Sequence, residues 1–308
     1  MTAITVEAFE KVGAGKTAQP ARTNPAPAGL RVPPPPPPSQ LAGPSSTEQN
    51  AAAMRAFFAQ ALPPVLGILL LLLVWHLATM KGGSLPTPAK TWEAAVKLFS
   101  DPFYRNGPND QGIGWNILSS LSRVGVGFGI AALIGIPLGF LLGRFATLSR
   151  MAGPIISLLR PVSPLAWLPI GLLVFKKADP AATWTIFICS IWPMIMNTAQ
   201  GVMRVPQDYL NVARVLNLSE WKIVTKILFP SVLPYMLTGI RLSIGTAWLV
   251  IVAAEMLTGG VGIGFWVWDE WNNLKVEHII IAIFVIGFTG LILEQTLLAL
   301  ARRLHTEA

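Results

Sequence analysis

Residues 211–230 read NVARVLNLSEWKIVTKILFP, a polar and basic stretch set between apolar runs that are each long enough to cross a bilayer. The pattern predicts a helix, a break and a second helix, with Pro230 at the start of the next span. Asn217 suits the break because asparagine, after glycine, most readily adopts the left-handed conformation that ends a helix. Ser219 suits the cap of the second helix. We therefore expect an ordered loop here.

The first helix of this loop has an apolar face. Leu210, Ala213 and Leu216 keep helical spacing, with Tyr209 and Arg214 beside them. Such a helix fits a groove in a partner protein; the alternative is an ordinary surface connection made of two short helices. The candidate partner-contacting residues are Tyr209, Leu210, Ala213, Arg214, Leu216, Asn217, Leu218 and Ser219.

The composition around this loop is that of a membrane protein. Of 308 residues, 53% are hydrophobic and only 12% are charged, which is too apolar for a soluble domain. The formal net charge is +8, but the basic residues are scattered among loops, where they flank spans rather than form a nucleic-acid surface. The single cysteine, Cys189, excludes a disulfide within the chain.

Runs of roughly 20 apolar residues span the hydrocarbon core, and we expect an all-α membrane protein with about six spans. They lie at about residues 61–80, 118–143, 155–175, 183–202, 230–257 and 278–300. The third is broken by Pro161, Pro164 and Pro169. The second carries small residues at four-residue intervals, a face on which another helix packs closely. These residues are Gly127, Ala131, Gly135, Gly139 and Gly143.

The sequence divides into three parts. Residues 1–55 form a tail rich in alanine and proline, with six consecutive prolines at 33–38, and we expect it to be disordered. Residues 56–303 form the transmembrane domain, with the loop at 204–226. Residues 304–308 are a C-terminal tail.

The loop resembles the segment that the permeases of ABC importers insert into their ATPase subunits, written E-A-A-x3-G-x9-I-x-L-P. Ala213, Ile227 and Pro230 match at the right spacing, while Asn211 and Asn217 replace the motif's Glu and Gly. Val212 replaces the first Ala and Phe229 the Leu. Further stretches, such as residues 159–169 and 248–257, are similar to permeases of the nitrate, sulfonate and taurine importer group. Residues 264–273 and 276–280 look most like the nitrate permeases.

This resemblance implies a type I importer permease in the bacterial inner membrane, multi-pass, with both termini in the cytoplasm. The implied partners are a second copy of the chain, two cytoplasmic ATPase subunits, an external substrate-binding protein, membrane lipid and a small anion, but no nucleic acid. The chain itself is then not an enzyme and has no cofactor; ATP and Mg²⁺ belong to the ATPases. The implied substrate is nitrate, with nitrite; the alternatives are bicarbonate or cyanate, and sulfonate or taurine.

Charges inside the spans are the first candidates for an anion path. An arginine would offset the hydration that nitrate loses on entering the path; the alternative is that Arg123, Arg160 and Arg241 pair with Glu255 or Glu294 to fix helix packing. Hydroxyl, amide and indole groups are the other candidates. The path candidates are Arg123, Arg160, Trp167, Asn197, Arg241, Ser243, Thr246, Trp248 and Glu255. The three histidines are isolated, so no metal site is expected.

Two other classes of protein compete with this interpretation. A secondary anion transporter working alone would need carboxylates near the midplane and often inverted repeats. The few carboxylates and the lack of visible repeats disfavour it. The third possibility is a membrane scaffold without transport activity.

Overall fold

The computed structural model describes residues 46–80, 82 and 85–306. The chain divides into two units, residues 1–66 and residues 67–308. The predicted disordered tail lies mostly outside the described residues, but its predicted boundary at residue 55 is wrong. Helix α1 (Ser46–Thr79) already includes residues 46–55, a segment in which three consecutive alanines favour the helix. At the other end, α11 continues through Thr306, so most of the predicted C-terminal tail is helical as well.

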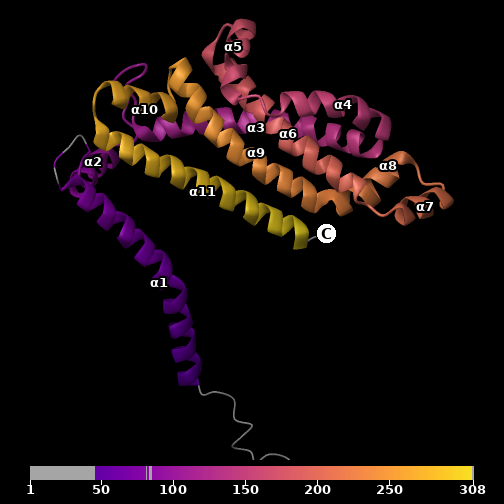
Figure 1. The fold of residues 1–308 in the computed structure, drawn as a ribbon, viewed down its shortest axis with the longest axis horizontal. Coiled ribbons are helices and arrows are strands. Elements are labelled where there is room, and N and C mark those ends of the chain that lie inside the picture. Colours follow the sequence, from indigo (N-terminus) through magenta and orange to yellow (C-terminus); the bar gives the residue numbers. More distant parts are fainter. Residues whose placement is uncertain (1–45, 81, 83–84, 307–308) are drawn as a thin grey trace, which may run out of the picture. The chain divides into compact units, whose positions relative to one another are not determined.

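The described residues form an all-α protein (Figure 1), as predicted. After α1 come α2 (Pro88–Ser100), α3 (Ile113–Arg144), α4 (Ala146–Leu159), α5 (Pro164–Phe175), α6 (Ala178–Met203), α7 (Gln207–Val215), α8 (Glu220–Ile223), a π-helical turn (Val224–Leu228), α9 (Phe229–Thr258), α10 (Ile263–Asn272) and α11 (Val276–Thr306). Within the described part of the chain, five helices are long and apolar enough to cross a membrane: α1, α3, α6, the α8–α9 run and α11.

The predicted third span is not one helix. It is divided into α4 and α5, which meet at an angle of 98°, and the count of six spans holds only if this bent pair is one span. The prolines explain the break. Pro164 stands in the first turn of α5, where its missing N–H costs no hydrogen bond. Pro161 follows the end of α4 and has no backbone N–H with which to continue the helix.

The small-residue face of α3 packs against α6, as predicted; the two helices lie side by side (Figure 1). A Cβ atom built on Gly139 would lie 2.6 Å from the Thr198 Cβ, and one on Gly127 would lie 2.8 Å from the Ile186 Cβ. Such distances leave no room for a side chain. The glycines therefore let the two backbones approach closely, which is how helices associate in a membrane.

We expect Gly139→Leu to destabilise this helix pair, since overpacking costs about 1–3 kcal/mol. Gly129→Leu is the matched control, because a Cβ at Gly129 on the same helix meets nothing within 4 Å. The thermal midpoint of the purified protein in detergent should fall for the first variant and stay near the wild-type value for the second. Equal midpoints would mean that the α3–α6 contact is loose.

Helices α3, α6 and α9 pack on one another, and α11 packs against α9 (Figure 1). At one end of α9 the chain enters from α8, and at the other it continues into α10. The α7–α8 segment and α10 therefore lie at opposite ends of the spanning helices. A loop at one end and a short helix at the other thus face opposite sides of the membrane.

Candidate functional site

The loop between α6 and α9 has the predicted helix–break–helix layout. Asn217 has a φ of 50°, and the Leu218 N–H donates to the Ala213 carbonyl at 3.0 Å while the Asn217 N–H donates to the Arg214 carbonyl at 3.0 Å. This pair of bonds is the Schellman ending that glycine or asparagine favours. The Ser219 hydroxyl accepts from the Lys222 N–H at 3.4 Å and caps α8. Both predictions about local structure are confirmed.

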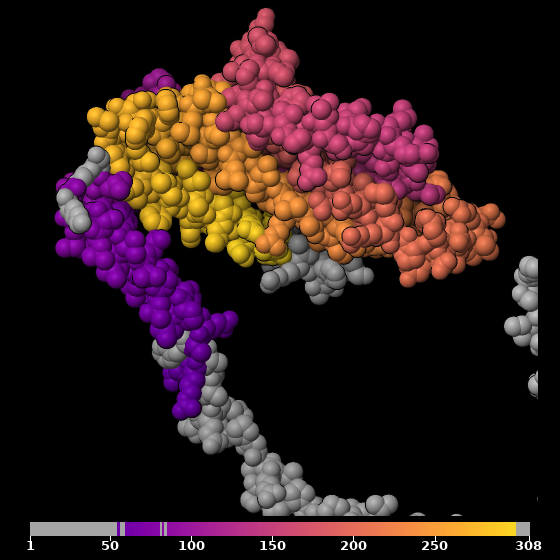
Figure 2. Space-filling view, in the orientation of Figure 1, coloured from indigo at the N-terminus to yellow at the C-terminus, as the bar shows by residue number. Residues whose placement is uncertain are grey.

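The predicted partner-facing side of α7 is correct for the exposed Tyr209 and Leu216 and wrong for Leu210 and Ala213. Leu210 and Ala213 are buried in the chain's own core, packed with residues of α6 and α9 such as Val202 and Val232. The exposed side of α7 is another apolar stripe, and we call it the α7 surface. It consists of Tyr209, Val212, Val215 and Leu216, of which Val215 is the most open at 81% exposure. Figure 2 shows this segment at one end of the helical unit.

The loop is tied to the spanning helices. Arg144, in the last turn of α3, pairs with Glu220 in the first turn of α8, with Nη2 and Oε1 3.1 Å apart. Within α7 the Arg214 guanidinium donates to the Asn211 side-chain oxygen at 3.0 Å. Together with the buried Leu210 and Ala213, these contacts make α7 and α8 one body with the ends of α3, α6 and α9.

Arg123 and Glu255 form the better-buried of two ion pairs among the spans. Arg123 Nη1 lies 2.6 Å from Glu255 Oε1, and the side chains are only 12% and 1% exposed. The Ser120 hydroxyl donates to both Glu255 oxygens at 2.8 Å. Arg123 also reaches Asp179 at the start of α6, at 2.7 Å. The group joins α3, α6 and α9, so the alternative pairing of Arg123 with Glu255 is confirmed.

The same group holds the glycine-rich turn before α10. The Gly264 N–H donates to Glu255 Oε2 at 3.0 Å, and the Ile263 N–H donates to the Ser120 hydroxyl at 3.0 Å. The Gly262 N–H donates to the Asn116 side-chain oxygen at 2.9 Å. A side chain at Gly262 would collide with the Glu255 carboxylate. Sequence reasoning missed this role of Asn116 and Ser120, although the repeated glycines at 259, 260, 262 and 264 indicated a close backbone contact.

Arg241 and Glu294 form the second ion pair, between α9 and α11. Both the Nε and Nη2 groups of Arg241 donate to Glu294 Oε1, the first at 2.8 Å. The predicted alternative, an Arg241–Glu294 pair, is therefore confirmed. Unlike the first pair, these side chains are 52% and 42% exposed. Placing a charge at this depth costs roughly 2.5–3.5 kcal/mol even on the lenient insertion scale.

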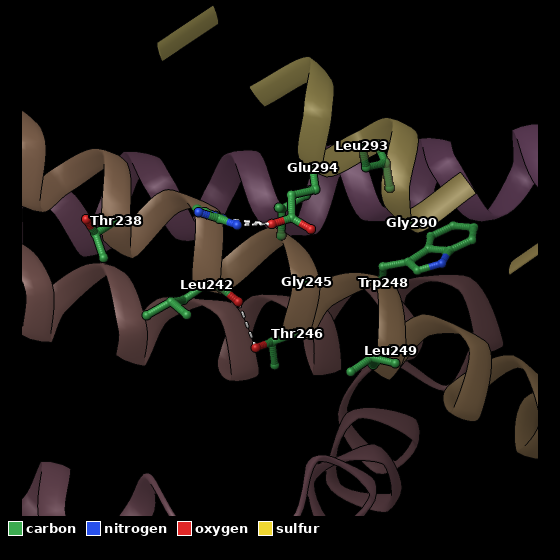
Figure 3. A pocket seen from close by; sticks show the side chains of 11 residues that line it. Thr238, Leu242, Gly245, Thr246, Trp248, Leu249, Gly290, Leu293 and Glu294 are labelled. Atoms are coloured by element: carbon green, nitrogen blue, oxygen red, sulfur yellow. Dashed lines mark hydrogen bonds and ion pairs between the residues drawn. The ribbon is translucent and has the colours of Figure 1, made fainter. Parts of the chain in front are cut away.

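A cavity of about 570 Å³ opens beside this second pair. Figure 3 shows Glu294, the ion-pair partner of Arg241, at its wall, together with Thr246 and Trp248 of α9. It is lined by Thr238, Arg241, Leu242, Ile244, Gly245, Thr246, Trp248, Leu249, Gly290, Leu293 and Glu294. The structure thus brings together three predicted path residues, Arg241, Thr246 and Trp248. Thr238 is a polar lining residue that the sequence-based candidates lacked, whereas Glu294 was already expected as a charge inside the spans.

The indole N–H of Trp248 already donates to the Ile286 carbonyl at 2.9 Å, so it is not a free donor for an anion. Gly290 leaves room for this ring, since a Cβ there would lie 3.0 Å from Trp248 Cδ1. The Thr246 hydroxyl donates to the Leu242 carbonyl at 2.9 Å. The guanidinium of Arg241 is therefore the main polar donor that the cavity presents.

The remaining path candidates lie away from this cavity. Ser243 is buried and donates to the Ser190 carbonyl at 2.6 Å. Asn197 donates to the Pro193 carbonyl at 2.8 Å and lies where α6 packs on Gly239. Arg160 stands at the bend between α4 and α5, and Trp167 lies in α5. The polar groups of Ser243 and Asn197 are engaged in helix packing, and neither residue lines the cavity beside Arg241.

A third polar cluster lies at the α10 end. Glu270 is buried, with Oε2 2.9 Å from His278 Nδ1 and 3.4 Å from Lys275 Nζ. The Trp266 ring stacks on the His278 ring at 5.8 Å between centroids. Burial raises the pKa of Glu270, but the hydrogen bonds and charges of His278 and Lys275 outweigh it, so the pKa lies below its ordinary value. The carboxylate form therefore stabilises the junction of α10 and α11.

The sign of this shift predicts how stability depends on pH. A carboxyl group with a lowered folded-state pKa contributes stability above its unfolded pKa of about 4.5, and this contribution is lost as the pH falls through the folded value. We expect Glu270→Gln to cost about 1.5–3 kcal/mol at pH 7, the range for hydrogen bonds to charged groups. The difference from wild type should shrink below pH 4.5 in thermal melts. Asp269→Asn, which changes an exposed neighbouring carboxylate, should show no such difference.

Comparison with known proteins agrees with this architecture. Residues 135–306 match the family model described as binding-protein-dependent transport system inner membrane component. The chain is 46% identical over 237 residues to the nitrate import permease protein NrtB of Synechocystis sp., covering 77% of this chain and 86% of that protein. It is also 46% identical over 238 residues to the bicarbonate transport system permease protein CmpB of the same organism, covering 76% and 85%.

Among solved structures, an amino acid ABC transporter has a similar fold. The TM-score is 0.51 at 14% sequence identity, and the match covers 73% of this chain and all of that one. At this identity the likeness concerns the fold alone.

Proposed function

Because the chain belongs to the family of binding-protein-dependent transport system inner membrane components, we propose that it carries nitrate, and nitrite with it, into the cell. The chain is a multi-pass permease of the inner membrane in an ABC importer, and it works with an ATPase and a substrate-binding protein. The 46% identity to a nitrate import permease over most of the chain supports a small-anion importer, and residues 264–273 and 276–280, which look most like the nitrate permeases, favour nitrate. A small monovalent anion also suits a cavity whose main polar donor is one arginine.

In this proposal the permease pairs with a second copy of itself and with two ATPase subunits, which hold ATP and Mg²⁺. The α7 surface is the contact with the ATPase: it is apolar, exposed and joined to three spanning helices. The loop end is then cytoplasmic, as are both termini, and α10 faces the binding protein. Basic residues at the loop end, such as Arg144, Arg214 and Lys222, support this orientation.

Bicarbonate is the second candidate, because the bicarbonate permease is as similar to this chain as the nitrate permease. Both anions are planar, carry one negative charge and present three oxygen atoms. The cavity chemistry therefore does not separate them. We expect most of the selectivity to come from the external binding protein, which delivers its ligand to a weakly binding path.

The test is ATP hydrolysis by the complete complex in liposomes, with the binding protein encoded beside the permease. Nitrate, nitrite, bicarbonate, cyanate and taurine are added one at a time. Nitrate and nitrite are expected to stimulate hydrolysis. Stimulation by bicarbonate alone would reject the nitrate assignment and keep the importer class. Anion uptake by the permease without ATPases would reject the importer mechanism in favour of a secondary transporter.

A further inference from the structure

The two ion pairs among the spanning helices differ in a way that packing does not explain. The Arg123–Glu255 pair is buried, and the Glu255 carboxylate also accepts hydrogen bonds from the Gly264 N–H and the Ser120 hydroxyl. The Arg241–Glu294 pair is about half exposed and stands at the wall of a cavity. Arg241 lies twelve residues after Phe229 and seventeen before Thr258, about 18 Å and 26 Å along α9. A half-exposed ion pair in the middle part of a spanning helix indicates a site at which a transported ion binds.

The contact between these two side chains is also a recognisable chemical arrangement. A guanidinium group presents N–H donors in a planar fork that matches two oxygens of a planar oxyanion. Here both Arg241 groups converge on one oxygen of Glu294, so the two-oxygen arrangement is not used. Nitrate, nitrite and bicarbonate share with a carboxylate the single charge, the planar shape and the oxygen spacing. Each of them can replace the Glu294 carboxylate on Arg241.

We propose that Arg241 is the anion-binding residue of the translocation path and that Glu294 occupies its site between transport events. This inference rests on the proposed function. The incoming planar monoanion displaces Glu294 from Arg241, and the returning carboxylate displaces the anion in turn. Because Glu294 competes for the same donors, the anion binds weakly and leaves readily.

The cavity supplies the room for the exchange. About 570 Å³ is ample for an anion of four atoms and for a displaced carboxylate. Gly245 lies in its wall, and a Cβ at this position meets nothing within 4 Å. The space beside Arg241 is therefore open in the structure rather than filled by side chains.

The test is nitrate titration of the purified permease–ATPase complex by calorimetry, without the binding protein. Because Glu294→Gln removes the competing charge, this variant should bind nitrate at least about tenfold more tightly than wild type, and Arg241→Gln should lose binding. Glu277→Gln, at the start of the same helix, is the control and should match wild type. The same titration is made with bicarbonate. Equal affinity of Glu294→Gln and wild type for both nitrate and bicarbonate, or binding of neither anion by either protein, would overturn the proposal.

A structural ion pair would give a different pattern. Both single variants would then lower the yield or thermal midpoint of the complex, and the double variant Arg241→Gln/Glu294→Gln would restore it without tighter binding by either. Gly245→Leu avoids this question because it changes neither member of the ion pair, and a Cβ at this position meets nothing within 4 Å. It should weaken nitrate binding at unchanged yield, whereas Gly287→Leu, whose Cβ also meets open space outside the cavity wall, should not.

The nitrate assignment and this inference fail separately. If Glu294→Gln binds bicarbonate, and not nitrate, more tightly than wild type does, the result supports the exchange of Glu294 for an anion on Arg241 (the exchange site) and rejects the nitrate assignment. If the complete wild-type complex imports nitrate and the Glu294→Gln affinity is unchanged for both anions, the importer stands and the exchange site falls.

Discussion

Val215→Asp is expected to abolish ATP-driven uptake while the permease stays folded and inserted. Val215 lies on the α7 surface, and its side chain is 81% exposed. An exposed substitution should change the free energy of unfolding by no more than about 0.5 kcal/mol. If the α7 surface lies in a groove of the ATPase, the new carboxylate is buried there without a partner, and this costs several kcal/mol of binding free energy. Uptake in proteoliposomes should fall at least about 30-fold.

Two variants of the same helix control this experiment. Asn211→Asp adds the same charge where the family motif has Glu, and it should retain uptake. Ala213→Asp is not a coupling test: Ala213 is fully buried in the chain's own core, so we expect low membrane abundance rather than a folded, uncoupled protein. Normal uptake by Val215→Asp would remove the α7 surface from the coupling mechanism.

The second large effect is expected at the buried ion pair. Arg123→Gln leaves the Glu255 carboxylate buried without its cation, and breaking such a pair typically costs 3–5 kcal/mol. The Gly262–Gly264 turn is held by the same group of side chains, so α10 should lose its position as well. We expect a much lower thermal midpoint and little protein in the membrane.

The controls for this prediction come from the same cluster. Arg123→Lys keeps the charge but loses the fork that reaches both Glu255 and Asp179, so it should recover only part of the stability. Asp179→Asn removes the outer, largely exposed partner, and exposed pairs contribute about 0–1 kcal/mol. If Asp179→Asn were as harmful as Arg123→Gln, the outer half of the cluster would be the stabilising one.

Local features of this chain were predictable because they depend on neighbouring residues. The Asn217 helix ending, the Ser219 cap and the small-residue face of α3 follow from backbone preferences and spacing that any single sequence contains. The bend between α4 and α5 was indicated by its prolines, but its 98° angle was not, since the direction after a break depends on tertiary packing.

Features that depend on distant contacts were only partly predictable. On the nine-residue helix α7, the stripe of Leu210 and Ala213 and the stripe of Val212 and Leu216 are both apolar, and nothing in the sequence says which one faces the core. Burial decides it. Likewise, composition identified the charged residues within the spans, but their pairing joins residues 53 and 132 positions apart. Only the packing of α3, α6, α9 and α11 selects the partners.

The central claim is that this chain is the anion path of an ATP-driven importer. The most direct test is accumulation of ¹⁵N-labelled nitrate in liposomes that contain the permease and its ATPase, with the binding protein on the same side as the nitrate and ATP on the opposite side. We predict accumulation above the external concentration, dependent on ATP and on the binding protein, and lost in Val215→Asp. Equilibration of nitrate without ATP, or no nitrate movement when the assembled complex hydrolyses ATP in response to the loaded binding protein, would contradict the account.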